Sequence, residues 1–271
     1  MIIGLISSYR DPLLASAVHS ALTGCEQVIV AEGPSMVEEH DPPPAISLEG
    51  LRHQTRVHLL ESVWSSEAQK KTLMVERARG LAGQSSRAAR RKARDSLWLL
   101  WLDSDEILVH GDYLRDQALL AEEGTAGGWA LRIVEPDGSV YRNNGRVVRA
   151  DLIRRYLMDW TQVELHNGVT LAFSHDTLCT AGGIPALDMD EWRHLTDQEK
   201  LERLGNKRPP LAGEPHILHR WHLRPESRQQ QELRGHKVER DWFEILDPHV
   251  QTCASRRGLA CDCPPGYGGN E

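Results

Sequence analysis

The sequence lacks the features that would assign it to a membrane or to the outside of a cell. None of its apolar runs approaches the roughly 20 residues that a membrane-spanning helix needs. Residues 1–7 are apolar but have no basic start and no cleavage site, so they do not have the pattern of a signal peptide. The 5 cysteines are an odd number at irregular spacing, unlike a secreted disulfide framework. These absences predict a cytoplasmic protein with no membrane span.

The sequence also lacks an excess of positive charge. Its formal net charge of -7 over 271 residues argues against strong non-specific binding to nucleic acid. A local exception is the basic run 87–94, which either binds a polyanionic acceptor or forms a solvated helix face, the usual outcome. With 40% hydrophobic and 26% charged residues, the chain has the composition of a globular protein, and it is long enough to bury a core.

The first part of the chain has the pattern of a strand–helix–strand unit. Residues 2–6 are a short apolar run, and residues 27–31 are a second one. Between them, Asp11 as N-cap and Pro12 at the first helical position predict a helix that stops at Gly24. Such a unit pairs its strands in parallel through a right-handed crossover, which predicts an α/β fold.

The remainder of the chain alternates between helical and extended patterns. Helical spacing predicts helices at 67–82, 196–204 and 226–245. Apolar or alternating runs predict strands at 97–102, 128–134, 139–149 and 160–173. The second and third of these strands flank a Pro-Asp-Gly turn and are expected to form a β-hairpin.

The acidic turn 103–106, Asp-Ser-Asp-Glu, directly follows the most apolar stretch of the chain. In open α/β sheets, ligands bind at the carboxyl ends of the strands. Because alternate residues of an extended chain point the same way, Asp103 and Asp105 are expected to face one ion. Hard divalent cations prefer such oxygens, and a cation there could bridge to a diphosphate. The alternative is that these acids only cap the next helix; their position after the apolar strand favours a metal site.

Several segments resemble family 2 type glycosyltransferases. Leu97–Leu108 is similar to the metal-binding segment of that family. The loop Ser7–Arg10 after the first strand and the segment Val28–Ser35 are similar to its nucleoside-binding parts. Lys70–Ala82 resembles the helix that approaches the donor ahead of the metal motif. The resemblance is good over residues 1–110 and weaker beyond them.

The resemblance implies the A-type nucleotide-diphospho-sugar transferase fold. This is a Rossmann-like α/β fold with a mixed, mostly parallel sheet flanked by helices, here with a C-terminal acceptor-side extension. It implies a nucleotide-sugar-binding half at 1–110, an acceptor and catalytic half at 111–247, and a flexible tail rich in Cys, Gly and Pro at 248–271. The chain departs from the family pattern in the insertion 36–66 and in the basic run 87–94.

The resemblance also implies a donor and a cofactor. The donor is a nucleoside-diphosphate sugar, with a UDP-sugar as the first expectation, and the cofactor is Mn²⁺ or Mg²⁺ held by Asp103 and Asp105. The implied donor contacts are Ser7, Tyr9, Arg10, Glu32, Lys71, Arg77 and Ser104. The acceptor stays open between a glycan, a protein, a small molecule and a modified DNA base.

Inverting members of the family use a carboxylate base downstream of the metal motif. A base is needed to take the proton from the attacking acceptor. The acidic segment 188–191 offers Asp190 as the first candidate, with Glu191 or Asp188 as the second. The alternative is that this segment is a solvated helix start.

Related transferases often complete the metal site with a C-terminal histidine. Residues 216–222 contain three histidines in a short strand or a turn. If the segment is extended, His216 and His222 share a face and His219 takes the other. If it is a turn, His219 and His222 lie together. His219 or His222 is therefore the expected third metal ligand.

Two other functions remain as alternatives. A sugar nucleotidyltransferase of similar fold usually has a phosphate loop rich in glycine and lysine, and the loop 7–10 lacks that pattern. A non-enzymatic nucleotide- or nucleic-acid-binding module would use the basic run 87–94 instead. In the tail, His249 and the last three cysteines either form a mixed zinc site or a loose chain with free thiols, and their irregular spacing favours the loose chain.

Overall fold

The computed structural model describes residues 1–34, 45–83, 97–123, 127–138, 140–157, 162–172, 210 and 212–224. Met1–Leu223 form one compact unit and Arg224–Glu271 a second, and the fold below is that of the first. Several predictions fall outside the described residues: the basic run 87–94, the carboxylates Asp188, Asp190 and Glu191, the helices 196–204 and 226–245, and the tail from 248. In the part of the chain that the structure describes, no helix is long and apolar enough to span a bilayer.

An 8-stranded mixed sheet is the centre of the fold, in the order β3-β2-β1-β4-β7-β6-β11-β5. Its strands are β1 (Ile2–Ser8), β2 (Gln27–Glu32), β3 (Val57–Glu61), β4 (Trp98–Asp103), β5 (Glu106–Val109), β6 (Gly128–Val134), β7 (Val140–Arg149) and β11 (His216–His219). Strands β3, β2, β1 and β4 are parallel, β7 is antiparallel to β4 and β6, and β11 is parallel to β6 but antiparallel to β5. The predicted α/β class with a mixed, mostly parallel sheet is confirmed.

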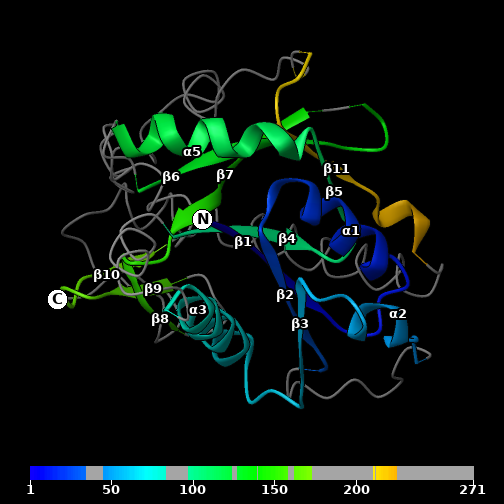
Figure 1. Cartoon of the computed structure of the whole chain (residues 1–271), viewed down its shortest axis with the longest axis horizontal. Helices are drawn as coiled ribbons and strands as arrows, with labels where there is room; N and C mark the ends of the chain where they lie inside the picture. Colours follow the sequence, from blue (N-terminus) through cyan, green and yellow to red (C-terminus); the bar gives the residue numbers. More distant parts are fainter. Residues whose placement is uncertain are drawn as a thin grey trace, which may run out of the picture. The chain divides into compact units, whose positions relative to one another are not determined.

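Helices cover both faces of this sheet (Figure 1). The helices are α1 (Leu14–Gly24), α2 (Glu49–Arg52), α3 (Glu67–Gly83) and α5 (Leu114–Glu123), with short 3-10 turns η1 (Gly111–Tyr113) and η2 (Trp221–Leu223). Buried residues of α1, α2 and α5 share one apolar cluster, and those of α3 share the other. The α3 cluster also includes residues of β8 (Ile153–Leu157) and β9 (Gln162–Leu165), which form a 3-stranded antiparallel sheet with β10 (Thr170–Ala172).

Strand β4 alternates its side chains between the two clusters. Trp98, Leu100 and Leu102 pack on the α1 side, whereas Leu99 and Trp101 pack on the α3 side. A strand buried on both faces has a continuous apolar sequence, and this explains why residues 97–102 were recognisable as a strand. The charged residues that follow therefore emerge from the middle of the sheet.

Two local predictions needed correction. Helix α1 begins at Leu14 rather than at Pro12, although the amide of Leu13 still donates to Oδ1 of Asp11 at 2.8 Å in the turn before the helix. The segment 36–66 is not only an insertion, because it contains β3, which extends the parallel sheet beside β2. Its sequence Val-His-Leu-Leu-Glu lacks regular alternation, which hid the strand.

Candidate active site

The candidate site lies where the parallel strands end. Strands β1, β2, β4, β6 and β11 run in the same direction, so their carboxyl ends share one edge of the sheet. The residues at or just after these ends are Ser8, Glu32, Asp103, Glu135 and His219. The strand order reverses between β1 and β4, because the chain builds β2 and β3 on one side of β1 and places β4 on the other. Open α/β sheets bind ligands at such a switch point.

The acidic turn has a different backbone from the one predicted. Strand β4 ends at Asp103, Ser104 and Asp105 form a turn, and β5 begins at Glu106, so the expectation of an extended chain was wrong. The side chain of Asp103 is 57% exposed, and its Oδ2 lies 3.5 Å from a guanidinium nitrogen of Arg146. Asp105 is only 1% exposed. The two carboxylates therefore differ in accessibility and in partner.

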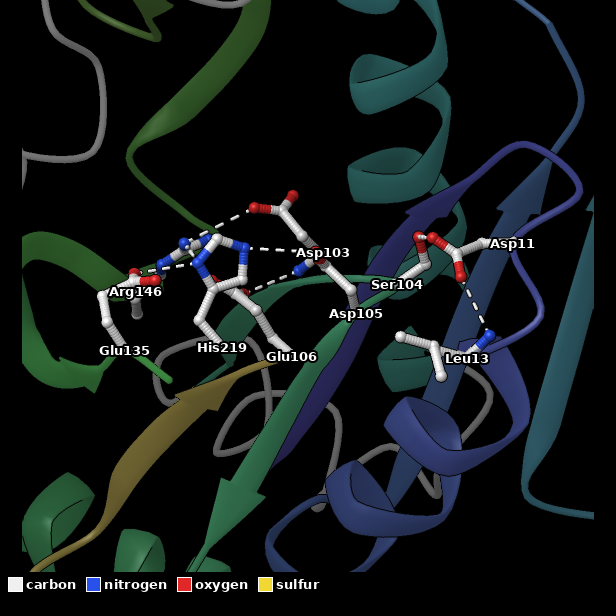
Figure 2. Close-up of polar contacts among 9 residues, drawn as sticks. All are labelled: Asp11, Leu13, Asp103, Ser104, Asp105, Glu106, Glu135, Arg146 and His219. Atoms are coloured by element: carbon white, nitrogen blue, oxygen red, sulfur yellow. Dashed lines mark hydrogen bonds and ion pairs between the residues drawn. The ribbon is translucent and has the colours of Figure 1, made fainter. Parts of the chain in front are cut away.

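His219 stands between two carboxylates (Figure 2). Its Nε2 lies 3.1 Å from Oδ2 of Asp105, and its Nδ1 lies 2.8 Å from Oε1 of Glu135. Burial lowers the pKa of His219, but the hydrogen bonds and charges of the two carboxylates outweigh burial and raise that pKa to about 9. At neutral pH the metal-free protein therefore holds an imidazolium that donates one proton to each carboxylate.

Of the two predicted histidines, His219 is the one that the structure brings to the acidic turn. It ends β11, whose backbone pairs with β5, and this register places His219 opposite Glu106. His222 lies in η2, where it is exposed. The segment is thus a strand that ends in a turn, a combination of the two predicted conformations.

Arg146 neutralises the acidic turn from β7. One of its guanidinium nitrogens lies 2.6 Å from Oε1 of Glu106, while Oε2 of Glu106 accepts the amide of Asp103 at 2.8 Å. Burial raises the pKa of Glu106 to about 7, with Arg146 opposing that rise and Asp103 adding to it. Glu106 therefore ties the backbone of the turn to a buried cation.

The predicted nucleotide-binding loop after β1 is held at several points. The hydroxyl of Ser7 donates to Oε1 of Glu67 at 2.7 Å. The amide of Arg10 donates to Oε1 of Glu32 at 2.6 Å, and Arg10 has the left-handed φ of 49°. The Arg10 guanidinium lies 5.6 Å from the centroid of the Tyr9 ring. Left-handed backbone at a bulky residue persists only when its surroundings enforce it, so this loop has one imposed conformation.

At the ends of β1 and β2, two buried side-chain oxygens have no hydrogen-bond partner among the described residues: Oε2 of Glu32 and Oγ of Ser8. The two residues face each other in the register of β1 and β2, and both are more than nine-tenths buried. Buried polar atoms of native proteins are rarely left unpaired, so this pair is a place where a ligand with N–H or O–H groups would fit.

The remaining predicted donor contacts lie in three different places. Lys71 is buried, with its Nζ 4.6 Å from the Trp101 ring centroid; burial lowers its pKa, and Asp103 opposes that change. Ser104 is also buried and turns toward α1 rather than outward. Arg77 lies beside His58, 3.5 Å from its Nδ1, about 15 Å along α3 from the helix start at the site edge. The structure brings Lys71 to the site and leaves Arg77 away from it.

Lys70 fixes the loops that follow β1 and β2. Its ammonium donates to the carbonyl of Ser8 at 2.9 Å and to that of Gly33 at 3.1 Å. Gly33 has a φ of 127°, and a Cβ there would collide with the carbonyl of Ser62. Lys70 is 2% exposed, and burial lowers its pKa. The two loops are therefore joined by one buried cation.

We expect Lys70→Met to destabilise the protein, because it removes the lysine donor from the carbonyl of Gly33 and one of two donors from the carbonyl of Ser8, which still accepts the amide of Gly33. Each unpaired buried group costs about 1–3 kcal/mol. Urea denaturation of the variant measures this loss, with Glu76→Gln, an exposed change on the same helix, as the control. Equal midpoints for the two variants would contradict the role of Lys70.

The residues at the acidic turn fit a divalent cation in part. Two adjacent ligands on a cation with bonds of about 2.1 Å lie about 3 Å apart, close to the 3.1 Å between Asp105 and His219. Metal-bound histidines usually donate their other N–H to a carboxylate, the position that Glu135 has here. Among the described residues, no group of three His, Cys, Asp or Glu side chains is arranged to hold a metal by itself.

No family model and no curated protein matches this chain. The site is therefore argued from its own residues. Sequence reasoning missed four of them: Asp11, Glu106, Glu135 and Arg146. Glu135 had a usable signal, since it follows the predicted strand 128–134 just as Asp103 follows the predicted strand 97–102. Arg146 had none, because it lies within a strand whose pairing with β4 only the fold reveals.

Proposed function

We propose that this protein is a metal-dependent glycosyltransferase with the A-type nucleotide-diphospho-sugar transferase fold. It moves a sugar from a nucleoside-diphosphate donor to an acceptor, with inversion at the anomeric carbon. The observation that carries the proposal is the contact between Asp105, in the turn after β4, and His219, at the end of β11. An acidic turn and a histidine 114 residues apart meet at the switch point of the sheet.

Asp103, Asp105 and His219 would hold Mn²⁺ or Mg²⁺. Such a cation stabilises the charge that develops on a leaving nucleoside diphosphate. To take part, His219 gives up the proton on Nε2 and keeps the one on Nδ1, which Glu135 accepts. Asp103, whose side chain is 57% exposed, would turn from Arg146 toward that cation.

Glu32 and Ser8 would hold the base of the nucleotide. The unpaired Oε2 of Glu32 is a hydrogen-bond acceptor, so it suits a base edge that offers an N–H. Uracil and guanine offer a ring N–H there, whereas cytosine and adenine offer a ring acceptor flanked by an amino group. This chemistry favours UDP- or GDP-sugars, which includes the expected UDP-sugar.

Lys71 and Arg146 would supply positive charge near the diphosphate. Both are buried within the electrostatic reach of Asp103. The proposed base, Asp190 with Glu191 or Asp188 as second candidates, lies outside the described residues, and so does the acceptor-side extension. The acceptor is accordingly proposed only as a hydroxyl or amine that loses a proton on attack.

A screen of donor hydrolysis tests the proposal. The purified protein is incubated with a panel of UDP-, GDP-, CDP- and ADP-sugars and Mn²⁺, and release of the nucleoside diphosphate is measured by mass spectrometry. We expect slow hydrolysis of one uracil or guanine donor that stops on addition of chelator. The melting temperature should also rise with the matching diphosphate plus Mn²⁺, because ligands that bind only the native state stabilise it.

Failure on both measurements would contradict the proposal. If no donor is hydrolysed and no diphosphate changes the melting temperature, the site does not bind a nucleotide sugar. Hydrolysis that persists in chelator would contradict the metal requirement but leave the transferase class standing.

A further inference from the structure

A buried bridge joins the start of α1 to the acidic turn. The hydroxyl of Ser104 donates to Oδ2 of Asp11 at 2.8 Å, and the amide of Leu13 donates to Oδ1 at 2.8 Å. Asp11 is 0% exposed and Ser104 is 4% exposed. Figure 2 shows Asp11 between Leu13, just before α1, and Ser104 of the acidic turn, with one oxygen directed to each.

Helix capping alone does not account for this bridge. A capping side chain needs a single acceptor oxygen, and serine or asparagine serves as well as aspartate. A fully buried carboxylate is costly unless each of its oxygens is hydrogen-bonded. The second oxygen of Asp11 is committed to Ser104, the middle residue of the turn. The carboxylate is therefore suited to hold two elements at once.

We infer that Asp11 is a positioning residue that fixes the conformation of the acidic turn through Ser104. On its other side the turn is held by Glu106, which accepts the amide of Asp103, and by the amide of Arg220, which donates to the carbonyl of Asp105. With Ser104 anchored to α1, the side chains of Asp103 and Asp105 are presented from a fixed backbone. The inference depends on the proposed function for the identity of what the turn holds, a divalent cation.

The direction of the side chains supports this assignment. Leu102 packs in the cluster on the α1 side, and Ser104 reaches Asp11 on the same side. Asp103 points the other way, where Arg146 and Lys71 lie. The turn thus uses its middle residue as an anchor, and Ser104, which we had expected to contact the donor, has its hydroxyl committed to the protein.

Three variants test the inference. Ser104→Ala removes the bridge. Asp11→Ser removes it as well but keeps a side chain that can cap the helix. Ser20→Ala is the matched control, because Ser20 is a buried serine of α1 whose hydroxyl donates to the carbonyl of Ala17 and accepts the amide of Leu108, rather than bonding residues 103–106.

Two measurements are made on each variant of the full chain. The first is hydrogen exchange of the Arg220 amide without metal, because this amide donates to Asp105 at 2.9 Å and reports the position of the turn. The second is Mn²⁺ affinity in the presence of uridine diphosphate, measured by electron paramagnetic resonance. We expect faster exchange and an affinity loss of about 10-fold in Ser104→Ala and Asp11→Ser, the usual effect of removing a group that orients metal ligands.

The outcomes separate the inference from the proposed function. Unchanged Arg220 exchange in Ser104→Ala, or an equal change in Ser20→Ala, overturns the positioning role. Faster exchange in the two bridge variants alone supports it, even if the wild-type protein binds no Mn²⁺, in which case only the proposed metal function fails. Faster exchange with unchanged Mn²⁺ affinity overturns the link between the bridge and the cation.

Discussion

Asp105→Ala is expected to abolish metal-dependent donor hydrolysis and to destabilise the metal-free protein. The carboxylate is buried and bonded to His219, so its loss leaves an imidazolium with Glu135 as its one remaining carboxylate. Breaking a buried ion pair from one side costs about 3–5 kcal/mol. Loss of a direct metal ligand should reduce activity by more than about 100-fold, the upper end of the effect of an outer-shell change.

Asp103→Ala should separate the loss of donor hydrolysis from the loss of stability. Its carboxylate is 57% exposed and 3.5 Å from Arg146, so we expect a similar loss of hydrolysis with little change in stability. Asp116→Ala, an exposed change on α5, is the control for both measurements. Chelator-sensitive donor hydrolysis and urea denaturation in chelator are the assays. Full activity in Asp105→Ala would contradict the proposed metal site, and full stability would contradict the ion pair with His219.

His219→Gln is expected to change the pH dependence of stability in the absence of metal. The folded-state pKa of His219 is raised to about 9, above its ordinary value of 6.5. Between these values the folded protein keeps a proton that the unfolded chain has lost, so stability decreases as the pH rises. The contribution is fully present below pH 6.5 and is gone once the pH has passed 9. The difference of 2.5 corresponds to about 3 kcal/mol, which solvent around the partly exposed ring reduces.

Urea denaturation of wild type and His219→Gln at intervals from pH 6 to pH 10, in chelator, measures this effect. The wild type should exceed the variant most at pH 6, and the difference should shrink toward pH 10. His222→Gln is the matched control, because His222 lies exposed in η2. A difference between wild type and His219→Gln that stays constant with pH would show that His219 does not bind its proton more tightly in the folded protein.

The sequence predicted a structural element where neighbouring residues alone determine that element. The apolar run 97–102 could only be a strand buried on both faces, and the turn Pro136-Asp137-Gly138 made the hairpin of β6 and β7 predictable. Strand β3 was missed, because its sequence Val-His-Leu-Leu-Glu does not alternate apolar and polar residues as half-buried strands usually do. The position of β5 was also not predictable, since its partner β11 comes more than 100 residues later.

The residues of the candidate site also differ in whether a local sequence pattern or a distant contact determines them. Asp103 and Asp105 were predictable because charge at the end of an apolar strand is a local signal. The choice between His219 and His222 was not, because it depends on where β11 ends and η2 begins. Asp11 was assigned to the helix N-cap, but the helix begins at Leu14 and Asp11 accepts the amide of Leu13 in the turn before it. Its second contact joins residues 93 positions apart, and no local pattern encodes that separation.

The place of β11 in the sheet affects the order in which parts of this protein can fold during synthesis. Among the described strands, β5 pairs only with β11, which lies between it and β6. During synthesis the acidic turn emerges long before His219, so residues 1–110 leave the ribosome without the strand that β5 pairs with and without the histidine that Asp105 binds. Native pairings of such high sequence separation form late in folding. Under the proposed function, Mn²⁺ binding would therefore begin in chains long enough to include β11, and not when residues 1–110 fold.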